Sequence, residues 1–300
     1  MSLAPALPAD PARAPMAPLL LLIATGALLG GNFALAKIAG AAGIPALGYA
    51  FWQSFGGGLV LLVLARFRLP LAPRFLRYYA VTGLVSMALP NAVIVLTVPK
   101  LGTGLAALAY AFPPLLTYGL ALGLRVERFQ AVRAAGILMG LAGALMILGP
   151  RGGLPDPGLW GWMLLALAAP VAIAAGNIYR SLDWPEGAAP QELAAGMLLA
   201  SALWLTPAVW LAGSFHMPGG NPADWTLLVQ IANSALTFVL YFALQKRAGP
   251  VYFSQLGYVT TVTGLAAGWL AFGERYGPLV FAAVAVIFSG VFLVNRKPAK

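Results

Sequence analysis

Long apolar runs separated by short polar breaks make up the chain from about residue 17 onwards. An α-helix needs roughly 20 residues to cross the hydrocarbon core of a bilayer. Measured against that length, the sequence predicts ten spans, at 17–37, 46–66, 76–98, 102–123, 131–149, 158–179, 191–212, 225–244, 250–272 and 277–294. Inside a membrane the backbone must satisfy its own hydrogen bonds, so runs of this length predict helices. The expected fold class is an all-α integral membrane protein.

The composition supports a bilayer rather than water as the solvent. Hydrophobic residues make up 61% of the chain and charged residues 9%, whereas about 25% of an ordinary soluble domain is charged. The chain has no cysteine, which excludes disulfides and Cys-based metal or redox sites. The net charge of +10 would suggest nucleic acid in a soluble protein. Here the cations stand at the ends of apolar runs, so we expect lipid and a small-molecule substrate as partners, and no nucleic acid.

The positions of the cations predict the orientation. If the N-terminus is cytoplasmic, 14 of the 18 Lys and Arg residues fall on the cytoplasmic side, and the others are Lys37, Lys100, Arg151 and Arg275. By the positive-inside rule both termini are then cytoplasmic, in a multi-pass protein of the inner membrane. The first run has an alternative interpretation as a cleaved signal peptide, because residues 34–36 resemble a cleavage site, although the run is long and the charged segment before it is weak.

The sequence also echoes itself at an offset of about 145–148 residues. Glu127-Arg128-Phe129 returns as Glu274-Arg275-Tyr276, and Gly143 then falls on Gly290, both at an offset of 147 (274 − 127). Gly31-Asn32 returns as Gly176-Asn177, and Pro45 as Pro190, at an offset of 145 (176 − 31). We therefore divide the chain into a disordered cytoplasmic tail (1–15), two five-helix repeats (16–150 and 151–295) and a basic cytoplasmic tail (296–300).

Five is an odd number of spans, so the second repeat must cross the membrane in the opposite sense to the first. Inverted repeats are a recurring transporter architecture, with the substrate site near the midplane where the repeats meet. Ten helices in two halves, with Glu127-Arg128 and Gly273-Glu274-Arg275 in the turns after the fourth helix of each half, resemble the EamA-type branch of the drug/metabolite transporter superfamily. The first half departs from the commoner Gly-Glu pair because Val126 precedes Glu127. Within the superfamily the chain looks most like the aromatic amino-acid exporters.

Polar residues inside the spans are the candidates for the substrate path, because polar groups in hydrocarbon usually face a cavity or a partner. Four are asparagines: Asn32, Asn91, Asn177 and Asn233. Either these amides bond across helix interfaces or they meet substrate. A second set, Tyr110 and Tyr118 in the fourth span with Gln255 and Tyr258 in the ninth, could line a pocket for a planar, partly polar solute. Tyr78 and Tyr79, near arginines, are expected to be interfacial belt residues.

Prolines and glycines supply candidate hinges for alternating access, namely Gly30, Gly31, Pro90, Pro113, Pro114, Pro170 and Pro207. None of the eight acids lies in the middle of a span, no Lys or Arg does so either, and the single His216 is in a loop. Proton-coupled pumps usually carry an intramembrane carboxylate or histidine. We therefore expect a facilitator of neutral or zwitterionic metabolites, with amino acids as the preferred class and no cofactor or metal.

Other function classes fit the sequence less well. An intramembrane enzyme would need a nucleophile with a base, paired carboxylates or metal ligands in the bilayer, and the spans offer none. A channel would show polar rings or a filter loop. A flippase for lipid-linked sugars, or a drug exporter of the same superfamily, is the alternative that stays open. The sequence gives no indication of the oligomeric state.

Overall fold

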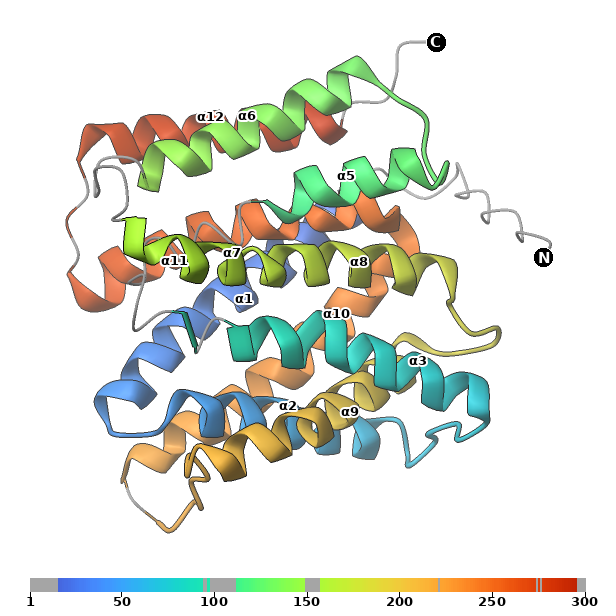
Figure 1. Ribbon diagram of the computed structural model, residues 1–300, viewed down its shortest axis with the longest axis vertical. Helices are drawn as coiled ribbons and strands as arrows, with labels where there is room; N and C mark the ends of the chain where they lie inside the picture. The colour runs from blue at the N-terminus through green and yellow to red at the C-terminus, as the bar shows by residue number, and fades with distance from the viewer. Residues whose placement is uncertain are drawn as a thin grey trace.

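The computed structural model describes residues 16–93, 96–97, 112–148, 157–220, 222–273, 275 and 277–295. The first half contains α1 (Met16–Ala41), α2 (Ala46–Leu64), α3 (Pro73–Gly83) with the π-helical turn η1 (Leu84–Ala88), α5 (Pro113–Gly123) and α6 (Ala131–Leu148). The second half contains η3 (Pro157–Leu159), α7 (Trp160–Ala166), α8 (Ala168–Leu182), α9 (Pro190–Leu211), η4 (Pro222–Asp224), α10 (Trp225–Ser254), α11 (Leu256–Phe272) and α12 (Pro278–Asn295). The regular elements within these ranges are all helical, as the apolar runs predicted, and Figure 1 shows them as one bundle.

Five of the described segments are long and apolar enough to cross a membrane: 17–41, 46–64, 161–182, 190–211 and 225–254. Shorter apolar helices occupy 131–146, 256–272 and 278–294. The fourth predicted span, 102–123, is described only from Phe112 onwards, and both predicted tails lie outside the described residues.

Breaks in the helices coincide with glycine and proline. Gly249 adopts φ 74°, which glycine tolerates because it has no Cβ, and Pro250 follows it. This bend separates the eighth and ninth predicted spans. The helix is interrupted between α7 and α8 at Leu167, where Pro170 cannot donate a backbone hydrogen bond to the preceding turn. The π-helical turn η1 likewise lies just before Pro90.

Most of the main contacts between helices recur when each helix is replaced by its counterpart in the other half. The counterparts are α1 and α7–α8, α2 and α9, α3–η1 and α10, α5 and α11, and α6 and α12. In two of these pairs the counterparts pack directly on each other: α2 packs on α9, and α6 packs on α12. Three further kinds of contact between the halves come in matched pairs: α1 on α11 corresponds to α8 on α5, α1 on α10 to α8 on η1, and α2 on α10 to α9 on α3. In Figure 1, α2 and α9 start from opposite ends of the bundle, as inversion requires.

Individual residues mark the axis that relates the two halves. The hydroxyl oxygens of Ser54 and Ser201 lie 3.3 Å apart, and these serines are 147 residues apart in the chain, which is within the range of the repeat offsets. The helices α2 and α9 therefore touch at, or within two residues of, counterpart positions. In the α6–α12 pair, a Cβ added to Gly290 would lie 2.5 Å from the carbonyl oxygen of Gly136. Small residues allow this close backbone approach, which is a common way for helices to associate within a membrane.

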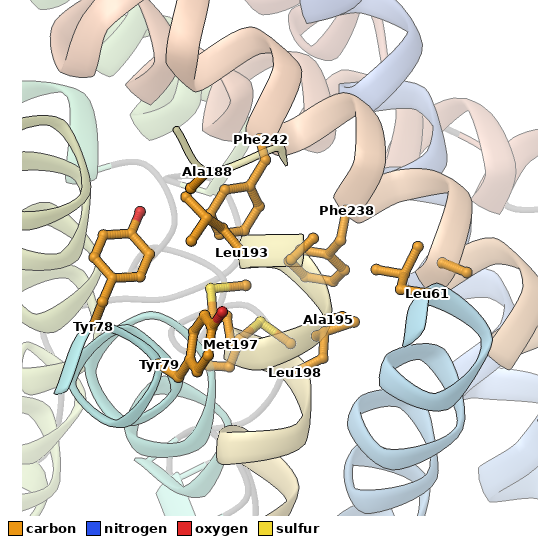
Figure 2. Packing of buried hydrophobic residues seen from close by; sticks show 13 residues of the cluster. Leu61, Tyr78, Tyr79, Ala188, Leu193, Ala195, Met197, Leu198, Phe238 and Phe242 are labelled. Carbon is orange, nitrogen blue, oxygen red and sulfur yellow. The ribbon is translucent and has the colours of Figure 1, made fainter. Parts of the chain in front are cut away.

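A cluster of buried side chains joins α2, α3, α9 and α10, as Figure 2 shows for Leu61, Tyr78, Tyr79, Met197, Phe238 and Phe242, among others. Tyr78 is 0% exposed and Tyr79 is 4% exposed, so the expectation that they are interfacial belt residues was wrong. The reason is the face of α3 on which they lie. A Cβ added to Gly196 of α9 would lie 2.3 Å from the Tyr79 ring, so the missing side chain of Gly196 makes room for the ring inside the bundle.

The connections between helices differ in charge at the two ends of the bundle. The α2–α3 and α5–α6 connections, at the right of Figure 1, contain Arg66, Arg68, Arg125 and Arg128. The α1–α2 and α9–α10 connections at the left contain no Lys or Arg. The end with the arginines is the one for which the sequence predicts a cytoplasmic location.

Candidate functional site

Asn177 is the centre of a buried polar cluster between the two halves. It lies on α8, is 1% exposed, and donates through Nδ2 to Thr117 Oγ1 of α5 at 3.1 Å. Its backbone oxygen accepts from Gln245 Nε2 of α10 at 3.1 Å, and the same Gln245 nitrogen donates to Ser181 Oγ at 2.5 Å. Asn177 therefore ties helices of the first and second repeats together at one point.

Arg180 follows Asn177 on the same face of α8, one helical turn later, and its side chain is fully buried. Its Nη2 donates to Asn177 Oδ1 at 2.7 Å, to the Tyr241 hydroxyl at 2.8 Å and to Gln245 Oε1 at 3.4 Å. Its Nη1 donates to the Ser86 hydroxyl of η1. Four helical segments, η1, α5, α8 and α10, thus supply one connected set of polar groups.

Aromatic rings enclose the charge of Arg180. Its guanidinium carbon lies 4.9 Å from the centre of the Tyr241 ring and 5.3 Å from that of Phe253. The two rings meet edge to face, with centroids 4.4 Å apart. A cation over such ring faces is attracted by their quadrupoles. The site therefore offers a fixed positive charge, amides and hydroxyls, and an aromatic wall.

The sequence prediction missed Arg180. Its span was expected to end at residue 179, so that Arg180 counted as a surface cation and no Lys or Arg lay within a span. The helix instead continues to Leu182 and turns Arg180 inward. The available signal was the spacing of three from Asn177, which places both side chains on one face of the helix.

A second polar contact, partly buried, joins Asn32 of α1 and Asn233 of α10. Asn233 Nδ2 donates to Asn32 Oδ1 and to the backbone oxygen of Leu28 at 3.2 Å. Asn32 is the counterpart of Asn177, and the counterpart of Asn233 at the offset of 147 is Ser86 (233 − 147), which bonds Arg180. Asn32 and Asn233 thus bond each other directly, whereas Asn177 and Ser86 are both bonded to Arg180.

The structure places the predicted tyrosines elsewhere. The Tyr118 hydroxyl accepts from the Gln130 backbone N–H at 2.9 Å and so fastens the α5–α6 turn. The Tyr258 hydroxyl donates to the Ile137 backbone oxygen at 2.8 Å, and its ring occupies the space beside Gly140 of α6. Neither hydroxyl is bonded to the Asn177 cluster. Tyr110 lies outside the described residues.

Two other predicted amides are buried with incomplete hydrogen bonding. Gln255 is 0% exposed; its Nε2 donates to the Val251 backbone oxygen at 3.4 Å, and its Oε1 has no partner among the described residues. The Nδ2 of Asn91, beside Pro90, has no described partner either. Each therefore retains hydrogen-bonding capacity that a ligand or a water molecule could use.

The candidate hinge residues lie in different kinds of surroundings: beside irregular turns, in the first turn of a helix, inside a helix, or at a helix contact. Pro90 and Pro170 adjoin the irregular turns η1 and α7–α8, while Pro113 and Pro114 form the first turn of α5, where a missing N–H is tolerated. Pro207 lies inside α9. Gly30 packs against Thr263 of α11, since an added Cβ would lie 1.9 Å from its hydroxyl oxygen, whereas Gly31 has open space.

Among the residues that the structure describes, no group of three or more His, Cys, Asp or Glu side chains gathers to hold a metal ion. His216 pairs instead with Asp224 at 2.8 Å in the α9–α10 connection. Its backbone oxygen accepts from Trp52 Nε1 of α2 at 2.7 Å. These contacts fasten the connection to the end of the bundle.

Comparison with known proteins agrees with this architecture. The model of the EamA-like transporter family matches twice, over residues 16–149 and 160–296. A solved structure described as "Crystal structure of protein" is 24% identical in sequence, with a TM-score of 0.73, and the match covers 91% of this chain and 94% of that one; it supports the fold alone. The search of curated proteins gave no match. Because the two family matches take in nearly the whole chain, one for each repeat, the chain belongs to the EamA-like transporter family.

Proposed function

We propose that this transporter exports small zwitterionic metabolites by alternating access, with amino acids, the aromatic ones included, as its substrate class. Membership of the family makes the protein a membrane transporter of small molecules rather than an enzyme. The observation that carries the substrate class is the cluster around Asn177, which combines amides, hydroxyls and aromatic rings at the contact between the two repeats. In inverted-repeat transporters the substrate site lies at this contact.

The chemistry of the cluster suits a zwitterion with an aromatic side chain. Asn177 and Gln245 each offer both a donor and an acceptor, so they can bond an ammonium as well as a carboxylate group. Tyr241 and Phe253 present ring edges and faces, against which a planar side chain can pack.

Movement and energy coupling complete the proposal. The irregular turns at η1, at the α7–α8 break and at Gly249 adjoin the helices that supply the cluster, and we propose that they bend during alternating access.

None of the eight acids of the chain lies in the middle of a predicted span, which favours a facilitator over a proton-coupled pump. The arginines of the α2–α3 and α5–α6 connections favour cytoplasmic termini in the inner membrane.

Counterflow in proteoliposomes tests the proposal. Vesicles loaded with unlabelled phenylalanine are given labelled phenylalanine, tryptophan, threonine or glutamate without any ion gradient. We expect saturable uptake of the aromatic amino acids, and strongly reduced uptake in the Asn177→Ala variant. Protein-free vesicles are the control. Uptake that requires an imposed pH gradient would exclude a facilitator. Absence of uptake for every amino acid would exclude the substrate class and favour a flippase for lipid-linked sugars or a drug exporter.

A further inference from the structure

We propose that Arg180 is the residue that recognises the carboxylate group of the substrate, so that transport selects solutes carrying a carboxylate. This inference rests on the proposed function, because it names the group that the Asn177 cluster reads. It is carried by a buried charge without a counter-charge, by the geometry of its partners and by its absence from the other repeat.

Arg180 carries a buried charge that no described acid balances. A buried cation is normally paired with a carboxylate, because removing it from water is strongly unfavourable. Every described hydrogen-bond partner of Arg180 is neutral, namely Ser86, Asn177, Tyr241 and Gln245. The nearest acid along the chain, Asp183, is bonded elsewhere: it accepts from Arg77 at 3.1 Å and from the Tyr179 hydroxyl at 2.6 Å.

The guanidinium group of Arg180 and its partners are arranged as a carboxylate ligand requires. Guanidinium presents a planar fork of donors that matches the two oxygens of a carboxylate. The Nε–H of Arg180 is buried and has no acceptor in the described residues. The Tyr241 hydroxyl accepts from Arg180, and its own proton remains free to donate. A carboxylate entering here would gain ionic hydrogen bonds in place of neutral ones, and a donor from Tyr241.

Arg180 has no charged counterpart in the first repeat. The offset of 145 that relates Asn177 to Asn32 places the counterpart of Arg180 at Leu35 (180 − 145). The bundle therefore packs around leucine at this position in one half and around arginine in the other. Packing alone does not require the charge. A charge present in one half only gives a bound substrate a single orientation relative to the two ends of the bundle. A site that binds a zwitterion in one direction needs such an orientation.

Competition in the wild-type protein tests the proposal without any variant. Uptake of labelled phenylalanine is challenged with 3-phenylpropionate, which keeps the carboxylate and lacks the amine, and with phenethylamine, which keeps the amine and lacks the carboxylate. We expect phenylpropionate to compete and phenethylamine to compete at least about tenfold more weakly, as loss of a hydrogen bond to a charged group implies. Equal competition by the two would overturn the proposal.

Variants then assign the effect to Arg180. We expect Arg180→Gln to lower the apparent affinity for phenylalanine roughly 10- to 150-fold, with phenylalaninamide unaffected, and Arg180→Lys to restore part of the loss. Arg77→Gln is the matched control, because Arg77 is also an arginine near Asp183 but its side chain is 64% exposed; it should behave as wild type. Unchanged discrimination between phenylalanine and its amide in a folded Arg180→Gln protein would refute the assignment.

A binding measurement separates this inference from the proposed function. A thermal-shift measurement on the detergent-purified protein detects binding to the site without transport. We expect phenylpropionate, but not phenethylamine, to stabilise the protein, and this stabilisation to vanish in Arg180→Gln. Stabilisation without any amino-acid uptake would leave the carboxylate site standing and reject the proposed function. Amino-acid uptake without carboxylate selectivity would support the proposed function and reject the carboxylate site.

Discussion

The tight α6–α12 contact makes a quantitative prediction about Gly290→Ala. The added methyl carbon would lie 2.5 Å from the carbonyl oxygen of Gly136 and 2.8 Å from the backbone nitrogen of Gly140. Both neighbours are backbone atoms, which cannot rotate out of the way as a side chain can. Ordinary contact begins at 3.4 Å, so the two helices must separate locally by about 0.9 Å.

That displacement sets the size of the effect. A gap of 0.5–1 Å removes roughly a quarter to a half of the dispersion energy of the atoms that face it, and overpacking of this kind costs about 1–3 kcal/mol. The higher helix propensity of alanine offsets up to about 1 kcal/mol of it. With that offset in full, we expect a net destabilisation of about 0–2 kcal/mol for Gly290→Ala, and a larger difference from a glycine variant that gains the same helix propensity without a clash.

Unfolding in mixed detergent–SDS micelles, followed by tryptophan fluorescence, measures the difference. Two glycines provide matched controls. A Cβ on Gly119 of α5 would meet nothing within 4 Å, so Gly119→Ala should be neutral or stabilising. In Gly143→Ala, at the counterpart position of Gly290, the added Cβ would lie 2.8 Å from the Ala283 carbonyl oxygen and 2.7 Å from a movable side-chain atom of Ile287. The loss of stability in this variant should therefore be intermediate. Equal stabilities for the Gly290 and Gly119 variants would refute the argument.

Three further predictions concern other contacts. Because the chain has no cysteine and the Ser54 and Ser201 hydroxyl oxygens lie 3.3 Å apart, a disulfide should form in the double variant Ser54→Cys/Ser201→Cys on oxidation. Both serines are buried, so maleimide labelling is measured after unfolding in SDS: the oxidised double variant should lose it and each single variant should keep it, whereas persistent labelling of the double variant would contradict the contact. Gly249→Ala should lower the unfolding free energy by about 1–3 kcal/mol through its backbone conformation alone, because φ 74° with ψ 174° is adopted almost only by glycine and no atom lies near its added Cβ; an unchanged unfolding midpoint would show that the bend is relaxed. Asn32→Ala and Asn233→Ala should be non-additive, with a coupling of about 0.6 kcal/mol in a double-mutant cycle, as hydrogen bonds between membrane helices give on average; strict additivity would deny the bond.

Much of the fold follows from the sequence because the bilayer fixes the length of an apolar helix. The run at 17–37 became α1 (Met16–Ala41), and the polar break near 245–249 became the bend at Gly249. The inversion of the second repeat follows from an odd number of spans, and the matched helix contacts agree with it. Prolines marked irregular positions, but the pattern did not say that Pro90 would follow a π-helical turn or that Pro170 would follow a break in the helix.

The candidate site was less predictable, because a linear pattern does not say which face of a helix turns inward. Asn177 was expected either to meet substrate or to bond across a helix interface, and it donates a hydrogen bond to Thr117 of α5. Arg180 was misjudged because an arginine near a helix end usually reaches water. The pairing of Asn32 with Asn233 joins positions 201 residues apart and depends on how α1 crosses α10. The Tyr118 hydroxyl is used by the Gln130 backbone of the adjacent turn, a local arrangement that spacing alone does not reveal.

The packing of α2 on α9 has a consequence for the history of the site. If the two repeats were once separate identical chains, α2 and α9 were the same helix, which packed on its own copy across an isologous dimer interface. In such a dimer every substitution occurs twice, so an arginine at the position of Arg180 would have buried two cations in one small bundle. Joining the copies into one chain freed each half to change alone. Leucine at position 35 and arginine at position 180 are what that freedom permits: a nearly symmetric scaffold holding a single, directional charge.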